Sequence, residues 1–326
     1  MGWRGALRSF AAAARAAERE ADRQHKAALR QQVANDAAAA VTDWETYIED
    51  LVRVHARMGD AVDWHAMAAR TKPVEPQLGQ SAHRDAEAAL AQFKPGLFDF
   101  LTGGTKQRRA KLERSLTEAP EVDAAAYASA KTKHAAALAE WENDTALARR
   151  LIAGEATALS EVIAEMTKAI EGQSLIGSEI AFTIDDHFVH ARPFVHGDDI
   201  IPSVRRKQLA SGKLSESKMP VGQFNELYQD YVASVALKVA GELFHVLPLE
   251  EIYVTCVTEM LNPQTGHKEK TPILSVQFVR ASFFRLNLAN LDPSDAMRNF
   301  RHAMAFKKSQ GFSPIDPLKP IDQPTA

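Results

Sequence analysis

The chain has 326 residues, of which 45% are hydrophobic and 25% are charged, and its formal net charge at pH 7 is −3. This composition is typical of a globular protein of about two domains. The slightly acidic balance excludes a global positive field that would draw the whole chain onto nucleic acid or an acidic membrane. The single cysteine, Cys256, excludes an internal disulfide framework and a cysteine-rich zinc module, and it fits a reducing cytoplasm.

The N-terminal segment is basic and rich in alanine, and we compared three interpretations of it. Arg4, Arg8 and Arg15 interrupt any apolar core of a signal peptide. Trp3, Leu7 and Phe10 would be the apolar anchors of an interfacial membrane helix. Acidic residues follow and the helical pattern continues, which favours a helix in a bundle. No segment of the chain approaches the roughly 18 to 20 apolar residues of a membrane span.

The first long helix is predicted from about Trp3 to Met58, without an internal glycine after the first turn and without proline. Two apolar seams advance in steps of three and four residues, which keeps one stripe of a helix toward a partner. The early seam is Leu7, Phe10, Ala14, Ala17 and Ala21, and the later seam is Val41, Trp44, Ile48, Leu51, His55 and Met58.

The second long helix is predicted over about residues 105–153, with Gly154 as its C-terminal stop. Pro120 predicts either a kink or a restart of the helix with this proline in its first turn. Short helices are expected after Asp63 and over 82–93, and an apolar knot at 97–101 would cap the tip. The seam of the second helix is Tyr127, Ala130, His134, Leu138, Trp141, Thr145, Ala148 and Ile152.

These segments predict an α+β protein in which two long helices form an antiparallel, coiled-coil-like hairpin. The hairpin would be a stalk over residues 1–155, with a small helical tip at about 59–103. Residues 156–326 would form a compact α+β domain with a mainly antiparallel sheet and a proline-rich tail. An alternative is that each long helix pairs with its copy in another subunit, because an alanine-rich pair buries little apolar area.

The elements of the second domain follow from hydrophobic periodicity. Helices are expected around 159–170 and 222–247, and a last helix is expected from Asp292 through FRHAM, with Asp292 as its N-cap and Pro293 in its first turn. Strands are expected in SEIAFTIDD and HFVHARPFVH. A further hairpin, IYVTCVTEM and TPILSVQFV, would turn at Asn262, Pro263 and Gly266.

The histidines of DDHFVHARPFVHGDD are the first candidate site. In a strand, His190 and His196 share a face but lie roughly 20 Å apart, which excludes one metal ion. We therefore expect a solvent-facing strand with aspartates in its flanking turns and predict no metal site. A ligand-facing sheet surface is the alternative.

The order of helices and strands in this domain resembles the core order of the restriction-endonuclease-like nucleases. That resemblance implies a divalent metal ion held by Asp198 or Asp199 and by Glu216, with Lys218 supporting the attacking water. The segment KLSESKM is too polar for the buried strand that this fold provides. No cofactor is expected outside this alternative.

The segment 203–218 is expected to be a polar loop. It holds Arg205, Arg206, Lys207, Lys213 and Lys218 with Glu216 as the one acid, and it could bind phosphates. Because no aromatic residue lies between the cations, base stacking is not indicated. A solvated charged loop is the alternative.

Four segments resemble a bacterial family of uncharacterised proteins with a long helical region before a small α+β domain. They are GALRSFAAAARAAERE, ELYQDYV, NPQTGHKEKTPILSV and LDPSDAMRNFRHAMAFKKSQGF. The resemblance implies a bacterial source and assigns no site residue.

The leading functional hypothesis is a non-enzymatic, cytoplasmic interaction or scaffold protein. It would self-associate or bind a protein partner through helices 3–58 and 105–153. The first alternative is a metal-dependent nuclease that serves in phage defence. The second is binding of nucleic acid or another anion through residues 205–218.

Overall fold

The structure is a computed structural model that describes residues 29–94, 104–170, 176–177, 179–185 and 188–320. The chain forms two compact units, and the α+β class is confirmed. One unit combines Met1–Val62 with Gly154–Ala326, and the other is Asp63–Ala153. The predicted seam at 7–21, the apolar knot at 97–101 and His187 lie outside the described residues.

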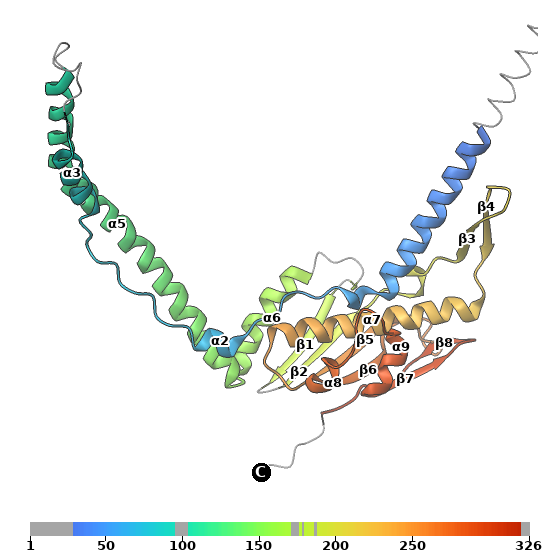
Figure 1. The fold of residues 1–326 in the computed structure, drawn as a ribbon. Coiled ribbons are helices and arrows are strands. Elements are labelled where there is room, and N and C mark those ends of the chain that lie inside the picture. The colour runs from blue at the N-terminus through green and yellow to red at the C-terminus, as the bar shows by residue number, and fades with distance from the viewer. Residues whose placement is uncertain (1–28, 95–103, 171–175, 178, 186–187, 321–326) are drawn as a thin grey trace, which may run out of the picture. The chain divides into compact units, whose positions relative to one another are not determined.

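The helices of the first unit pack around its strands (Figure 1). They are helix 29–52, η1 (Val54–Ala56), α6 (Ala156–Ile170), η2 (Asp198–Ile200), α7 (Val221–Val246), α8 (Arg280–Phe283), α9 (Pro293–Ala296) and η3 (Met297–Asn299). The strands are β1 (Glu179–Asp185), β2 (Phe188–Phe194), β3 (Val204–Gln208), β4 (Leu214–Lys218), β5 (Glu251–Leu261), β6 (Lys268–Val279), β7 (Arg301–Lys307) and β8 (Gly311–Ser313).

The central sheet has six strands in the order β1-β2-β5-β6-β7-β8, and β3 and β4 form a separate two-stranded ribbon. Neighbouring strands in the sheet are antiparallel except β2 and β5, which are parallel. The sheet is therefore mixed and mainly antiparallel. The predicted turn between β5 and β6 is confirmed, since Gly266 has a φ of 70° and its N–H donates to the Asn262 carbonyl at 2.8 Å.

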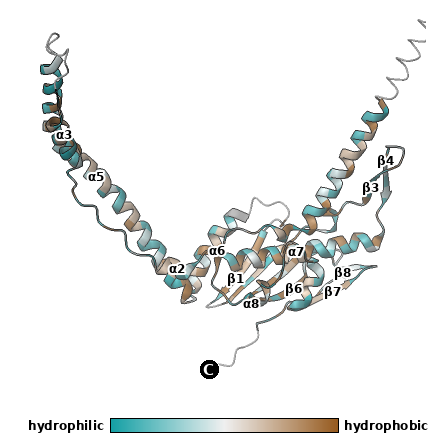
Figure 2. Cartoon of the chain, viewed as in Figure 1, coloured by the Kyte–Doolittle hydropathy of each residue, from teal (hydrophilic) through white to brown (hydrophobic). Residues whose placement is uncertain are grey.

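Helix α7 lies across one face of the sheet and supplies much of the core (Figure 1). Tyr231, Leu243 and Phe244 are among its buried side chains. Gly241 allows the chain to approach α7 closely, because a Cβ there would lie 2.5 Å from Met58 Cε. Figure 2 shows the same organisation, with apolar residues on the strands and α7.

The later seam of the first helix packs within its own unit, and its exposure falls toward its end: Val41, Trp44, Ile48 and Met58 are half-buried, whereas Leu51 and His55 are buried. Leu51 is fully buried and His55 is 1% exposed. The Trp44 indole Nε1 donates to the Val204 carbonyl at 3.0 Å, and Met58 lies against Gly241. The helix also ends earlier than predicted, at residue 52. Beyond that point the His55 backbone N–H donates to Ser234 Oγ at 3.1 Å, so contacts with α7 replace further helical turns.

The second unit contains α2 (Trp64–Ala68), α3 (Ser81–Ala91) and the 49-residue α5 (Gly104–Ile152). Asp63 caps α2 by accepting the Ala66 N–H at 2.9 Å, as expected for a helix that begins after this aspartate. Helix α5 continues through Pro120 rather than restarting there.

The predicted seam of α5 faces the segment 64–91. Trp141 Nε1 donates to the Arg70 carbonyl at 2.8 Å, and His134 Nε2 lies 3.3 Å from the Pro73 carbonyl. Helices α2 and α3 both contact α5. Because α5 pairs with this connector and helix 29–52 belongs to the other unit, the predicted helical hairpin is not confirmed.

Three local predictions in the first unit are wrong. Residues 300–304 are not part of a helix: α9 ends at Ala296 and η3 at Asn299, and β7 follows and pairs with the edge of β6. Residues 203–218 form the β3–β4 ribbon instead of a loop, with Arg206 directly opposite Glu216. Strand β2 is internal rather than solvent-facing, since β1 and β5 flank it.

Candidate functional site

A cavity of about 530 Å³ lies at the carboxyl ends of β2 and β5. Parallel strands end at the same edge of a sheet, and such edges are common binding places in α/β sheets. Its lining comes from the end of β2 and the following loop, and from the β5–β6 hairpin: Phe194, Val195, His196, Gly197, Asp198, Asp199, Thr258, Glu259 and Lys268.

Two tyrosines of α7 hold the loop that carries the cavity's aspartates. Tyr228 donates its hydroxyl to the His196 carbonyl at 2.9 Å, and the His196 N–H donates to Tyr231 Oη at 3.3 Å. The Tyr47 hydroxyl from helix 29–52 donates to the Ile200 carbonyl at 2.9 Å. The loop is therefore fixed at both ends by side chains from distant parts of the sequence.

The cavity is lined mainly by negative charge. Asp198, Asp199 and Glu259 face Lys268, whose Nζ lies 3.8 Å from Glu259 Oε2. Burial raises the pKa of Tyr228, and Asp198 and Asp199 raise it further, so the hydroxyl stays protonated as a donor. This charge balance suits a cationic ligand. Within the described residues, no group of three or more histidine, cysteine, aspartate or glutamate side chains is arranged to hold a metal ion.

The residues of the nuclease hypothesis fall into two different structures. Asp198 and Asp199 line the cavity, whereas Glu216 and Lys218 lie on β4 of the ribbon and are not among the described lining residues. Glu216 Oε1 accepts from Arg206 Nε at 2.9 Å. The geometry therefore gives the proposed metal site no support.

The histidines of the strand have separate environments. His190 is 4% exposed, and its Nε2 lies 2.8 Å from Thr255 Oγ1, which in turn lies 2.7 Å from Ser275 Oγ. Burial, with a smaller effect from Arg192, lowers the pKa of His190 to about 4, so the ring is neutral at pH 7. His196 lines the cavity instead. The expectation of a solvent-facing strand is wrong at His190, whose side chain is buried against Thr255 of β5, whereas Arg192, Phe194 and His196 are half-buried.

The C-terminal segment contributes to that burial. Residues 314–320 are extended, and the Ile315 N–H donates to the Pro272 carbonyl at 3.1 Å. The Leu318 N–H donates to Ser275 Oγ at 3.0 Å. The described part of the proline-rich tail, up to residue 320, therefore packs on β6.

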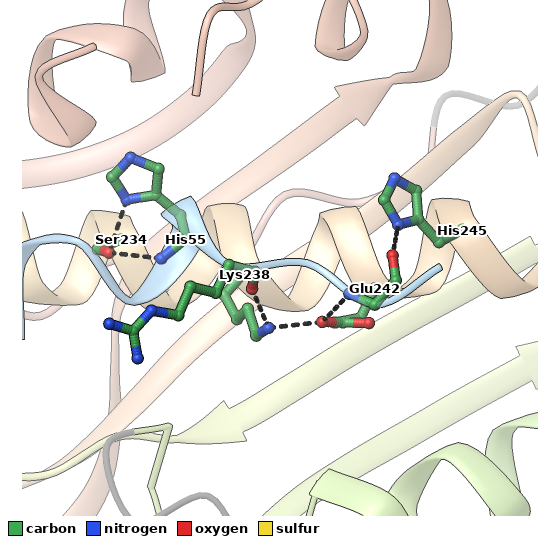
Figure 3. A network of polar contacts seen from close by, with 7 residues as sticks. His55, Ser234, Lys238, Glu242 and His245 are labelled. Carbon is green, nitrogen blue, oxygen red and sulfur yellow. Dashed lines mark hydrogen bonds and ion pairs between the residues drawn. The ribbon is translucent and has the colours of Figure 1, made fainter. Parts of the chain in front are cut away.

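A buried polar network joins residues 55–59 to α7 (Figure 3). His55 Nδ1 lies 2.8 Å from Ser234 Oγ, and Lys238 Nζ lies 2.5 Å from Glu242 Oε1. The serine and histidine resemble a catalytic dyad, but Ser234 is fully buried and no substrate can reach it. The network is structural. Polar residues four apart in an otherwise apolar helix, Ser234, Lys238 and Glu242, are the sequence signal for it.

The second unit leaves several apolar side chains in solvent. Val74 is 90% exposed and Leu78 61% exposed on the extended segment 69–80, and Val122 of α5 is 55% exposed. Asp123 accepts the Ala82 N–H at 2.9 Å, which places the adjacent Val122 near the start of α3. These three side chains form what we call the apolar strip.

Comparisons of the chain with protein-family models, curated proteins and solved structures found no match.

Proposed function

We propose that this protein is a non-enzymatic interaction protein whose helical unit, residues 63–153, binds a second copy of itself. The apolar strip of Val74, Leu78 and Val122 is the observation that supports the proposal. Isolated exposed apolar residues are ordinary, but two in one short extended segment, with a third close by, are typical of a contact surface.

The helical unit has a thin core, which also favours a partner. A 49-residue helix extends roughly 74 Å at 1.5 Å per residue. Among the described residues, α5 is packed against a single layer, which consists of α2, the segment 69–80 and α3. Burial is mostly of small side chains such as Ala119 and Ala148. Little apolar area is removed from water in such a layer, so a second layer would add stability.

We infer that a second copy is the partner because each copy carries the same exposed apolar side chains. Two copies related by a twofold axis would place the same strip of each against the other, the usual arrangement in homodimers. The seams of helix 29–52 and α5 are occupied by contacts within their own units. Self-association is therefore proposed through the strip rather than through the seams.

Sedimentation velocity from about 1 µM to about 100 µM tests the proposal, a range that brackets dissociation free energies of roughly 5 to 8 kcal/mol. The natural chain should associate, and Val74→Ser with Leu78→Ser should raise the dissociation constant at least about tenfold. The matched control is Val221→Ser with Leu261→Ser, which replaces two exposed apolar residues of the first unit. A monomer throughout, or equal weakening by the control, would overturn the proposal.

The cavity at the ends of β2 and β5 supports a second candidate function, the binding of a small organic cation. The lining holds three carboxylates and one lysine, and the lysine is near Glu259, which leaves Asp198 and Asp199 to face a ligand. The Phe194 ring and Thr258 add an apolar wall and a hydroxyl. A primary amine or guanidinium compound matches this chemistry.

Calorimetric titration with spermidine, arginine amide and choline tests the second candidate. Binding of at least one compound should be lost in Asp198→Asn with Asp199→Asn. It should persist in Asp60→Asn with Asp316→Asn, which removes the same charge elsewhere in the first unit. If none of the three compounds gives a heat of binding, or if both variants lose binding equally, this candidate function is refuted.

A further inference from the structure

The β3–β4 ribbon separates its charges between two faces. Alternation along β3 places Val204, Arg206 and Gln208 on one face, and the register places Leu214, Glu216 and Lys218 of β4 on the same side. Gln208 Nε2 donates to the Ala34 carbonyl at 2.6 Å, so this inner face is toward helix 29–52. The ribbon and the helix run beside each other in Figure 1.

The acid of the segment is neutralised on the inner face. Glu216 lies directly opposite Arg206 and pairs with it at 2.9 Å. A cross-strand pair of this kind stabilises the ribbon and cancels one positive charge. The only carboxylate within residues 204–218 is therefore directed away from the opposite face.

The outer face carries cations and hydroxyls. Arg205 and Lys207 project from β3, and Ser217 and Ser215 lie opposite them on β4. Arg205 and Lys207 are exposed, as is Lys213 at the turn. Among the residues that the structure describes, no carboxylate lies within ion-pair distance of these three cations, and Arg205 Nη1 donates only to the neutral Gln223 Oε1 at 3.3 Å.

A positive surface of this kind is local, since the whole chain carries a net charge of −3. Successive side chains on one face of a strand lie about 6.6 Å apart, roughly two steps of the 3.4 Å rise per nucleotide along a DNA strand. Arginine, lysine and serine are typical donors to phosphate oxygens. A two-stranded ribbon also fits the major groove of B-form DNA, which is about 12 Å wide, whereas the major groove of A-form RNA is too narrow.

We propose that the outer face of the β3–β4 ribbon binds the phosphate backbone of double-stranded DNA, without sequence preference. Arg205, Lys207 and Lys213 supply the charge, and the hydroxyls of Ser215 and Ser217 add neutral hydrogen bonds. No aromatic side chain lies on the ribbon, which separates this mode from single-strand binding by base stacking. This inference does not depend on self-association through the helical unit.

Fluorescence anisotropy of a labelled mixed-sequence duplex of about 20 base pairs, roughly two helical turns, tests the inference. With three phosphate contacts, the logarithm of the binding constant should fall against the logarithm of salt with a slope of about −2.7, so affinity should drop roughly 40-fold between about 50 mM and about 200 mM salt. Arg205→Ser with Lys207→Ser should weaken binding at least about tenfold and reduce the slope to about −1.

Two controls separate the outer face from the charge of the molecule as a whole. Lys307→Ser with Lys319→Ser removes the same charge from exposed positions on β7 and the C-terminal segment, and it should leave duplex binding unchanged. Arg206→Gln with Glu216→Gln removes the inner pair without a change in net charge, and it should also bind normally. Circular dichroism should show that every variant keeps its fold, because the outer-face residues are exposed.

Three outcomes would overturn the inference. One is no duplex binding at about 50 mM salt. Another is equal weakening of duplex binding by the outer-face variant and the Lys307/Lys319 variant. A third is co-sedimentation with vesicles containing one-third phosphatidylserine, lost in the outer-face variant, without binding to DNA. The last result would assign the same cations to a membrane surface.

Discussion

Replacement of Lys238 by methionine should strongly destabilise the first unit, because it removes one partner of a buried ion pair in α7. Lys238 is 5% exposed; its Nζ lies 2.5 Å from Glu242 Oε1 and also donates to the Arg57 carbonyl. Glu242 Oε1 accepts the Gly59 N–H at 3.1 Å. The variant leaves the glutamate with that N–H and without its counter-charge, in a site where its side chain is 12% exposed (Figure 3).

The size of the effect follows from two opposing contributions. At 2.5 Å and an effective dielectric constant of 20, the gross attraction of two unit charges is about 6.6 kcal/mol. Desolvation of both groups offsets most of it. Lys238→Met alone should therefore lower the free energy of unfolding by about 3 to 5 kcal/mol, and the double variant with Glu242→Leu should recover a large part of that loss.

Urea denaturation followed by hydrogen exchange of peptides from α7 reports the first unit separately from the helical unit. Additive single and double variants, or a single-variant loss below about 1 kcal/mol, would refute the reasoning.

Three further predictions concern single residues: Asp230, Asp123 and Cys256. Burial raises the pKa of Asp230 to about 6, so stability should fall as the pH rises from about 4 through 6, and Asp230→Asn should abolish that slope and add at most about 3 kcal/mol at pH 7.5. If the midpoint of thermal unfolding changes with pH in Asp230→Asn as it does in the natural chain, this reasoning is contradicted. Asp123→Ala removes the acceptor of the Ala82 and His83 N–H groups, so the amide hydrogens of α3 should exchange several-fold faster. The exchange rate in Asp123→Asn should lie between those of the natural chain and Asp123→Ala. Burial also raises the pKa of the Cys256 thiol, and iodoacetamide should modify it only in denaturant; labelling of the native chain would disprove the buried site.

The periodicity of the sequence predicted which stripes are buried but not what covers them. Steps of three and four correctly indicated Leu51 and His55 as one buried face. The same pattern is satisfied by any apolar surface, and α7, which supplies it, is more than 170 residues away, as the contact of His55 with Ser234 shows. A seam alone therefore cannot distinguish a coiled coil from a helix packed on a sheet domain.

Short sequence motifs predicted where an element begins better than where it ends. Asp292 and Pro293 correctly predicted a helix start, and Asp292 Oδ1 accepts the Asp295 N–H at 2.9 Å. The extension of this helix through Met304 was wrong, because edge pairing with β6 outweighs helix propensity. In the cavity, Asp198 and Asp199 could be found at the exit of β2. Glu259 and Lys268 could not, since only the parallel pairing of β2 with β5 brings them there.

The division of the first unit in the sequence has a consequence for how the chain folds. Residues 63–153 form a discrete insertion between two parts of one domain. The Val62 N–H donates to the His245 carbonyl at 2.8 Å, so the last residue before the insertion binds near the end of α7. During synthesis, the helical unit is complete before α7 exists, whereas helix 29–52 must wait for its binding surface. Until then its apolar stripe has no intramolecular cover, so the ribosome-bound chain should depend on a holding chaperone or on rapid closure around the insertion.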